Sequence, residues 1–443
     1  MEVTLFQMLQ AREERAERQR KLLGQFGKPL VCFTMNIPGP VKNGPLIRRA
    51  FRFGCGLLEK RVAGILHRES IDAVTGCEAM YAVDADPVEL KRICTAIEDE
   101  TPLGRLFDMD VLDPDGNKLD RSLVNGKSRD CIVCDAPGRG CASRRLHPVA
   151  ELQKATHSIL EAHFFPQDCG KIAETAVQSL IDEVHTTPKP GLVDRRNNGS
   201  HRDMTLDTFI ASAKALGPYF GGCFAIGHET EELSPAETFA QLRRVGLEAE
   251  QAMYRATGGV NTHKGAIFTL GILCGSLGRL WNGEIPATEA ILHECGRVAA
   301  VSLEEDFARL TGAGTTAGER LYLTRGITGI RGEAAAGLPA VTNVGLPVFR
   351  DCLAKGYSPN DAGAVTLLHL IARVADTNLY HRGGEEGAAW AAKEAEKLLP
   401  APAMEQIEAL DDAFIRRNLS PGGCADLLAV TYFLHALEEK CKL

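Results

Sequence analysis

Residues 183–204 read EVHTTPKPGLVDRRNNGSHRDM and directly follow an amphipathic, helix-like pattern at residues 171–184. Pro188 and Pro190 lack backbone N–H groups and disfavour helix at the residues before them. The sequence therefore predicts a helix that ends in a rigid loop at this point.

Charge gathers on this loop. Glu183 and Asp194 are carboxylates, Lys189 lies between the two prolines, and Asn197 belongs to a group of Arg, Asn and His residues without apolar periodicity. Such charge on stiff backbone is typical of a site for an anionic, hydroxyl-rich ligand such as a nucleotide. A solvated surface loop is the alternative interpretation.

Length and charge limit the class of protein. The 443 residues suffice for two or three domains, and a net charge of -8 leaves no basic excess for nucleic acid or anionic lipid, so we expect neither as a partner. Residues 1–28 lack the apolar core of a signal peptide, and the longest apolar stretch, residues 265–277, is shorter than the ~18 residues of a membrane span. We therefore expect a cytoplasmic protein whose 14 cysteines are reduced thiols.

The fold class expected is multidomain, with an α+β domain at residues 1–160 and an all-α domain at residues 168–443. The first part mixes strand signals with helical ones, in strands at residues 29–35 and 78–83 and helices at residues 45–61 and 87–98. Residues 164–170, FFPQDCG, interrupt the helical pattern and place the boundary between residues 157 and 169.

Helical periodicity dominates beyond that boundary. We expect helices at residues 171–184, 205–217, 235–256, 263–280, 286–310, 361–380, 387–398, 403–417 and 423–440. Helix 263–280 is apolar, and its glycines permit close approach of another backbone, which favours a central, buried position; they are Gly265, Gly271, Gly275 and Gly278.

Asp108 and Asp110 stand two residues apart in a short apolar strand, so both carboxylates project from the same face of the sheet. Two such oxygen ligands can share a Mg²⁺ ion that also binds a pyrophosphate leaving group. The alternative is the exposed polar face of an edge strand.

Cys131, Cys134, Cys141 and His147 follow the pattern C-x2-C-x6-C-x5-H. They match a structural zinc site in ligand type and number. The alternative is a set of reduced thiols near the surface.

A Pro/Gly loop at residues 36–43 leads into predicted helix 45–61 and gathers Lys42, Arg48 and Arg49. Cations and backbone amides at a helix start suit a polyphosphate. The loop is not a P-loop, because it lacks the G-x-x-x-x-G-K-[ST] pattern.

Other polar residues lie at predicted helix ends. Asn261, His263 and Lys264 occupy a first turn, where capping is the alternative to phosphate contact by Lys264. Residues 418–426, NLSPGGCAD, open the last helix with amides that suit an anion, although Asp426 could instead complement the helix dipole. His369, Arg373 and Asp376 fall at i, i+4 and i+7 of predicted helix 361–380 and would share one face.

Residues 187–204 resemble the signature of triphosphoribosyl-dephospho-CoA synthases. Four further segments agree with that family in the same order; they read GVNTHKG at 259–265, GIRGEA at 329–334, DTNLYHRG at 376–383 and NLSPGGCADL at 418–427. The resemblance implies that the all-α domain joins ATP to 3'-dephospho-CoA, which releases adenine and forms 2'-(5''-triphosphoribosyl)-3'-dephospho-CoA.

This chemistry cleaves an N-glycosidic bond. It needs a carboxylate to stabilise positive charge on the ribosyl ring, a group to accept the proton of the attacking hydroxyl, and Mg²⁺ and cations to hold the triphosphate. Matched to the motifs, the resemblance implies that the catalytic carboxylates are Glu183, Asp194, Glu333 and Asp376. The implied nucleotide-binding residues are Lys189, Asn197, Asn261, His263, Lys264, Arg331, Asn378, Arg382, Ser420, Gly422, Gly423 and Asp426.

Residues 33–42, FTMNIPGPVK, residues 102–111, PLGRLFDMDV, and the Cys131–His147 pattern resemble holo-citrate lyase synthase. That family transfers the phosphoribosyl-dephospho-CoA group to a serine of the citrate lyase acyl carrier (γ) subunit, which would be the partner. A fusion of both activities explains both halves. Two alternatives stay open, namely the equivalent role in malonate decarboxylase maturation and a non-catalytic assembly factor for the acyl carrier subunit.

Overall fold

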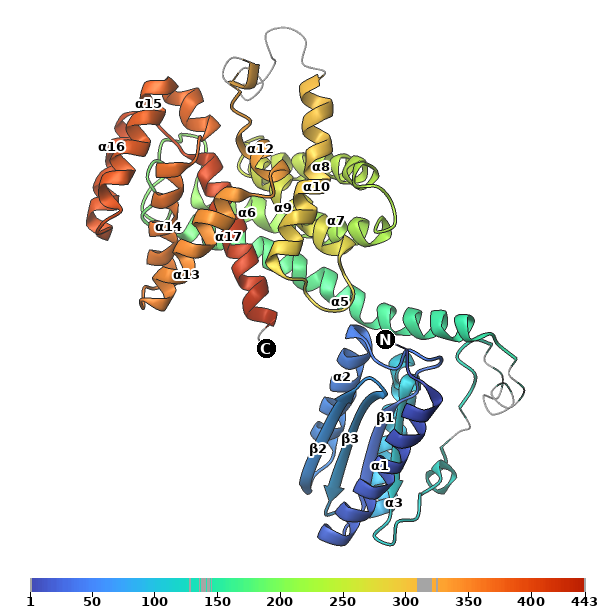
Figure 1. Cartoon of the computed structure of the whole chain (residues 1–443). Coiled ribbons are helices and arrows are strands. Elements are labelled where there is room, and N and C mark those ends of the chain that lie inside the picture. Colours follow the sequence, from blue (N-terminus) through green and yellow to red (C-terminus); the bar gives the residue numbers. More distant parts are fainter. Residues whose placement is uncertain are drawn as a thin grey trace. The chain divides into compact units, whose positions relative to one another are not determined.

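The computed structural model divides the chain into two compact units, Met1–Gln167 with Asn282–Glu284, and Asp168–Trp281 with Ile285–Leu443 (Figure 1). The structure describes residues 2–126, 129–134, 136, 141, 144, 146–308, 321–323 and 326–441. The first unit contains a small antiparallel sheet and the described part of the second is helical, in agreement with the predicted fold class.

The sheet of the first unit has the strand order β2-β3-β1-β4. Its strands are β1 (Leu30–Met35), β2 (Ile65–Ala73), β3 (Gly76–Val83) and β4 (Phe107–Leu112). The sequence analysis did not predict β2, an edge strand in which exposed residues alternate with half-buried ones. The helices of this unit are α1 (Leu5–Phe26), α2 (Pro45–Arg61) and α3 (Pro87–Glu100), with 3-10 turns η1 (Pro102–Leu106) and η2 (Arg121–Val124).

Both faces of the sheet are covered. Leu22 of α1 packs in a buried cluster with Leu30, Cys32 and Met80 of the strands. The side chains between them point to the other face, since strand residues alternate. There Phe33 stacks on Phe51 of α2, with ring centroids 4.9 Å apart.

Helix α5 (Val149–His185) runs without interruption through Pro166, so the predicted helix break at residues 164–170 is wrong. Proline in a helix interior costs about 3 kcal/mol. Burial of Leu160, Phe164 and Ile172 on the same helix offsets that cost, because each fully buried side chain of this kind contributes about 1.5–3 kcal/mol.

The described helices of the second unit after α5 are α6 (Leu206–Ala215), α7 (Gly217–Glu229), α8 (Pro235–Thr257), α9 (Lys264–Arg279), α10 (Thr288–Ala308), α12 (Gly329–Ala335), α13 (Leu346–Ala354), α14 (Pro359–Arg373), α15 (Thr377–Leu398), α16 (Met404–Arg416) and α17 (Gly422–Cys441), with a π turn η3 (Val341–Gly345). Sequence analysis did not predict α7, α12 and α13. The end of predicted helix 286–310 lies outside the described residues.

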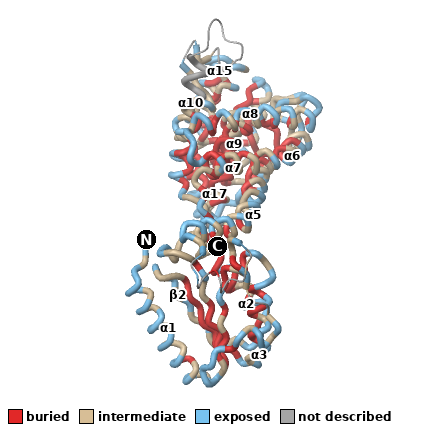
Figure 2. Tube along the Cα trace, turned by 90° about the vertical axis from the view of Figure 1, so that its right-hand side faces the viewer, coloured by how far each residue is buried: buried red, intermediate tan, exposed pale blue. Residues whose placement is uncertain are grey.

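Helix α9 is central, as its glycines predict, and buried residues follow α7, α9 and α17 (Figure 2). A Cβ atom added at Gly227 of α7 would lie 1.9 Å from the carbonyl oxygen of Gly275. A Cβ at Gly278 would lie 2.0 Å from the carbonyl oxygen of Phe224. The two helices therefore meet backbone to backbone.

The predicted helix 361–380 is helical but not continuous, because α14 ends at Arg373 and α15 begins at Thr377. The Asp376 side chain accepts hydrogen bonds from the Asn378 and Leu379 N–H groups and thus caps α15. His369, Arg373 and Asp376 therefore do not share one helix face.

In the described part of the chain, length and composition single out Leu206–Glu229 as the one candidate membrane span. It comprises α6 and α7, which meet at Leu216. Close packing of α7 on α9 within the helical unit accounts for its apolar composition.

Candidate active site

The charged loop after α5 is tied to α16 by Asp411, whose side chain has no exposed surface. Asp411 accepts from the Gly191 N–H (2.8 Å) and from the Asn197 side-chain amide (2.7 Å), and it pairs with Arg196 (2.8 Å). Sequence analysis missed Asp411, because an acidic residue on an amphipathic helix carries no sign of such a partner.

Asp194 folds the loop onto itself. Its Oδ2 accepts from the Lys189 N–H (3.0 Å), and its Oδ1 accepts from the N–H groups of Arg196 (2.7 Å) and Asn197 (3.0 Å). These bonds show how Asp194 shapes the loop, whereas its role as a catalytic carboxylate stays a prediction.

Lys189 and Glu183, both predicted site residues, form a buried ion pair. Lys189 Nζ lies 2.5 Å from Glu183 Oε1, and the two side chains are 2% and 5% exposed. Burial raises the pKa of Glu183, while the lysine opposes the rise. A buried pair of this kind is held only if its geometry is good, so each partner depends on the other.

Asp426 of α17 lies against the start of α9. A Cβ at Gly265 would be 1.9 Å from Asp426 Oδ2, and the carboxylate accepts from the Ala266 N–H. Asp426 thus complements the dipole of α9, a different helix from the one the sequence suggested. Burial raises its pKa well above the usual range, and the negative charges of Glu183 and Asp376 add to the rise.

The first turn of α17 is partly occupied by the chain itself. The Cys424 N–H, one of the amides expected to bind an anion, donates to Asp376 Oδ2 (2.8 Å). A Cβ at Gly423 would lie 3.1 Å from the same oxygen, and one at Gly422 would lie 2.8 Å from the side-chain nitrogen of Asn378. Asp376 therefore joins the ends of two helices, and burial raises its pKa.

His263 is the N-cap residue of α9 and is 3% exposed. Its Nδ1 lies 2.7 Å from Ser212 Oγ, and Ser212 in turn accepts from the Thr262 hydroxyl (2.8 Å). Nε2 has no protein partner among the described residues. Burial, and then the positive charge of Lys189, lower the pKa of His263 to about 3, so the ring is neutral near pH 7.

Ser420 and Arg382 meet at His201, which sequence analysis did not assign to the site. His201 Nε2 lies 2.9 Å from Ser420 Oγ, and Arg382 donates to the Ser200 carbonyl oxygen (2.8 Å) and contacts His201 Nδ1 (3.2 Å). Burial, with the nearby guanidinium, lowers the pKa of His201 to about 4.

Glu333 and Arg331 lie on α12. Glu333 Oε2 accepts from the Ala340 N–H (3.0 Å), and burial raises its pKa. The Arg331 guanidinium lies 5.9 Å from the centre of the Phe268 ring of α9. Near the start of α9, exposed Lys264 pairs with Glu250 at 3.0 Å.

Asn261 caps the turn before α9, since its Oδ1 accepts from the Lys264 N–H (3.3 Å). This is the capping interaction that the sequence analysis weighed against phosphate contact. Ligand binding by Asn261 and Lys264 stays a prediction.

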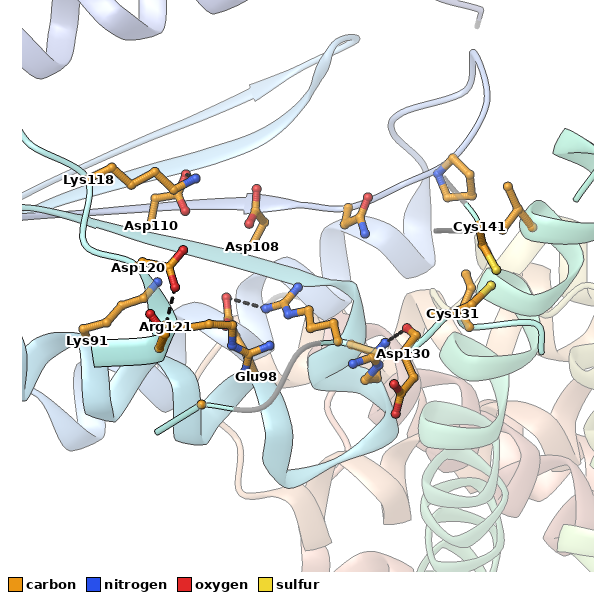
Figure 3. Close-up of a pocket in the computed structure, with 18 of the residues that line it drawn as sticks. Lys91, Glu98, Asp108, Asp110, Lys118, Asp120, Arg121, Asp130, Cys131 and Cys141 are labelled. Atoms are coloured by element: carbon orange, nitrogen blue, oxygen red, sulfur yellow. Dashed lines mark hydrogen bonds and ion pairs between the residues drawn. The ribbon is translucent and has the colours of Figure 1, made fainter. Parts of the chain in front are cut away.

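The first unit contains a cavity of about 1110 Å³ beside β4 (Figure 3). Asp108 and Asp110 line it from the same face of β4, as their spacing predicts, and Asp110 pairs with Lys118 at 2.6 Å. Its lining includes five cations that sequence analysis missed: Lys91, Arg105, Lys118, Arg121 and Arg129.

Two of the lining residues protect the edge of the sheet. The buried Lys91 donates to the Met109 carbonyl oxygen (3.2 Å), and the buried Glu98 accepts from the Met109 N–H (2.7 Å). These bonds pair the Met109 backbone groups at the outer edge of β4, which would otherwise lack partners. Arg121 pairs with Asp99, while its Nε and Nη1 are buried without a protein partner among the described residues.

Lys42, Arg48 and Arg49 do not line this cavity. Lys42 donates to the Ile37 carbonyl oxygen (2.5 Å), and the Arg49 guanidinium lies 4.4 Å from the centre of the Phe164 ring. Their binding of a polyphosphate stays a prediction.

The cysteine and histidine side chains of the predicted zinc site come together. The ligand atoms of Cys131, Cys134, Cys141 and His147 all lie within 4.8 Å of one another. Such a cluster is compatible with a metal site.

Two family models match the chain. One, described as ATP:dephospho-CoA triphosphoribosyl transferase, matches residues 169–443, and the other, described as apo-citrate lyase phosphoribosyl-dephospho-CoA transferase, matches residues 3–163. The chain is similar to Protein CitXG of Haemophilus influenzae (35% identity; 97% of this chain and 96% of the relative) and of Leuconostoc mesenteroides subsp. cremoris (31%; 98% and 97%). It is also similar to a probable 2-(5''-triphosphoribosyl)-3'-dephosphocoenzyme-A synthase of Vibrio cholerae (44%; 61% of this chain and 90% of the relative).

Proposed function

We propose that this chain makes the citrate lyase prosthetic group and attaches it to the acyl carrier subunit. The chain belongs to the ATP:dephospho-CoA triphosphoribosyl transferase family and to the family of the fused CitXG proteins. The chain is a bifunctional transferase. The observation that carries the proposal is the presence of both family regions in one chain, with paired aspartates on a cavity in the first. The citrate lyase family of that region favours this system over malonate decarboxylase maturation.

In the second unit, the 2'-hydroxyl oxygen of 3'-dephospho-CoA attacks C1' of the ATP ribose. The bond from C1' to adenine breaks, the hydroxyl proton ends on adenine, and the triphosphate stays on the ribosyl group. Lys189 supplies positive charge for the phosphates, and Glu183 beside it supplies the carboxylate that stabilises charge on the ribosyl ring. His263 donates a hydrogen bond from Nε2 to the bound nucleotide.

In the first unit, the serine hydroxyl of the acyl carrier subunit attacks the α-phosphorus of the triphosphoribosyl group. The bond from that phosphorus to the bridging oxygen breaks, and pyrophosphate leaves with the proton of the serine hydroxyl. Asp108 and Asp110 would hold Mg²⁺, which when bound neutralises charge on the departing group. Arg121, whose guanidinium Asp99 fixes, orients the phosphates through Nε and Nη1, which have no partner among the described residues. We place the protein in the cytoplasm, because its substrates ATP and dephospho-CoA occur there.

Two variants separate the reactions. With ATP, Mg²⁺ and dephospho-CoA, Lys189→Met should lower adenine release on the order of 10²-fold or more, because a charge at the reacting nucleotide is lost. With purified triphosphoribosyl-dephospho-CoA and apo acyl carrier protein, Asp108→Asn should lower the gain in carrier mass by a similar factor.

Each variant should leave the other reaction unchanged, and the exposed Lys171→Met and Asp115→Asn serve as matched controls that keep both. No adenine release by the unaltered chain would refute the first activity. Loss of adenine release in Asp108→Asn would refute the assignment of the cavity to transfer alone.

A further inference from the structure

We propose that Cys131, Cys134, Cys141 and His147 bind one structural Zn²⁺ ion, and that this ion holds a wall of the cavity beside β4. The separation of two of the sulfurs fits a metal site and excludes a disulfide. Cys134 Sγ lies 3.5 Å from Cys141 Sγ, too far for a disulfide bond of about 2.05 Å. Tetrahedral Zn²⁺ with bonds of about 2.0–2.3 Å places its ligand atoms roughly 3.5–3.8 Å apart.

The histidine is oriented for a metal. Its Nε2 faces the sulfur of Cys134 at 3.2 Å, and its Nδ1 lies 3.1 Å from Glu151 Oε2 on α5. A carboxylate on the outer nitrogen is the usual support of a metal-binding imidazole, because it fixes the ring and raises its basicity. Glu151 thus extends the cluster beyond its four ligands.

The donor set identifies the metal and its role. Three thiolates and one imidazole favour Zn²⁺ over the oxygen-seeking Mg²⁺. Four protein ligands complete a tetrahedron and leave no position for substrate, which is the arrangement of a structural site. Cys131 and Cys141 are buried, so the ion would lie partly inside the fold.

The cluster also borders the proposed transferase site. Cys131 and Cys141 line the same cavity as Asp108 and Asp110 (Figure 3), and His147 also belongs to its lining. The described residues between η2 and α5 belong to none of the four strands of the sheet, and their backbone bonds are local, from the Cys131 N–H to the Ala136 carbonyl oxygen and from the Leu146 N–H to the Cys141 carbonyl oxygen. A metal that joins four side chains of this segment restrains it over a longer range.

The test uses the full chain and two histidines. His147→Asn removes a proposed ligand, and His157→Asn is its matched control. The exposed His157 of α5 contacts Glu161 four residues later, just as His147 contacts Glu151. Zinc is measured by elemental analysis after purification in zinc-containing buffer and desalting. We expect about one equivalent of zinc per chain in the unaltered protein and in His157→Asn. In His147→Asn we expect zinc affinity to fall at least about tenfold.

A second measurement does not depend on a variant. Co²⁺ added to the metal-depleted unaltered chain should give the sulfur-to-cobalt and visible bands of a tetrahedral thiolate site, and Zn²⁺ should abolish them. Absence of these bands, or unchanged zinc binding in His147→Asn, would overturn the proposal.

The effect on the cavity rests on the proposed transferase function. His147→Asn should lower transfer to the carrier protein about tenfold or more and leave adenine release within about twofold. Stoichiometric zinc with no transfer by the unaltered chain would refute the function and support the site. Transfer at the normal rate after zinc loss would overturn the role of the ion in the cavity wall.

Discussion

Ser212 Oγ on α6 lies 2.7 Å from His263 Nδ1 at the start of α9, and this contact orients the buried ring. Ser212 accepts from Thr262, so its own proton can be donated to Nδ1. On a neutral ring whose Nδ1 accepts from Ser212, Nε2 carries the N–H group. This buried donor is available to a bound nucleotide.

Loss of that donor should lower synthase activity. We expect His263→Ala to reduce adenine release on the order of 10²-fold, and Ser212→Ala to reduce it roughly tenfold, because only ring orientation is then lost. Ser276→Ala is the control, since Ser276 is buried in α9 and donates to its own helix at the Ile272 carbonyl oxygen. Equal rates in Ser212→Ala and Ser276→Ala would contradict the orienting role.

His263 should also make stability depend on pH. Its pKa is about 3 in the folded chain against an ordinary value of 6.5, so between these values the unfolded chain binds a proton that the folded chain does not. The contribution of neutral His263 to the free energy of unfolding is therefore complete above about pH 6.5. It is lost as pH falls below that value, by at most roughly 1.4 kcal/mol per pH unit. The free energy of unfolding, measured by urea titration from about pH 7 to 4, should fall less steeply with decreasing pH in His263→Gln than in the unaltered chain. The exposed His293→Gln should keep the original slope, and equal slopes in all three chains would contradict this assignment.

Asp411 and Asp412 are adjacent acids with different expected effects on stability. Asp411→Ala leaves the Gly191 N–H and Arg196 without their buried acceptor and should lower the free energy of unfolding by about 3–5 kcal/mol. Asp412 also pairs with Arg196 but is 48% exposed, so Asp412→Ala should cost less than about 1 kcal/mol. Denaturant titration of both variants measures the difference, and similar losses would show that Asp411 does not anchor the loop.

Two glycines of α7 test the contact with α9. Gly227→Ala would place a Cβ 1.9 Å from the Gly275 carbonyl oxygen and should cost about 3 kcal/mol or more. Gly222→Ala, in the same helix with no atom within 4 Å of its added Cβ, should be neutral or stabilising by up to about 1 kcal/mol. Thermal unfolding distinguishes them, and equal midpoints would mean that the helices are not in backbone contact.

The sequence was sufficient for features that depend on local pattern. Hydrophobic periodicity placed α2 and α9 closely, the period of two put Asp108 and Asp110 on one face, and the glycines of α9 indicated its central position. These predictions succeeded because each depends on residues a few positions apart. The helix break predicted from Pro166 is wrong, because packing of neighbouring apolar side chains outweighs the helix-breaking preference of proline.

Only the tertiary structure showed which polar groups already have partners. The sequence by itself identified Asp194, Asp376 and Asp426 as motif carboxylates, but not that all three accept backbone hydrogen bonds, Asp426 from the first turn of α9. The bond from Gly191 to Asp411 joins residues 220 positions apart. Because a buried polar group takes whatever partner the folded chain brings within about 3 Å, such pairings leave no periodic trace in the sequence and are decided only when the helices pack.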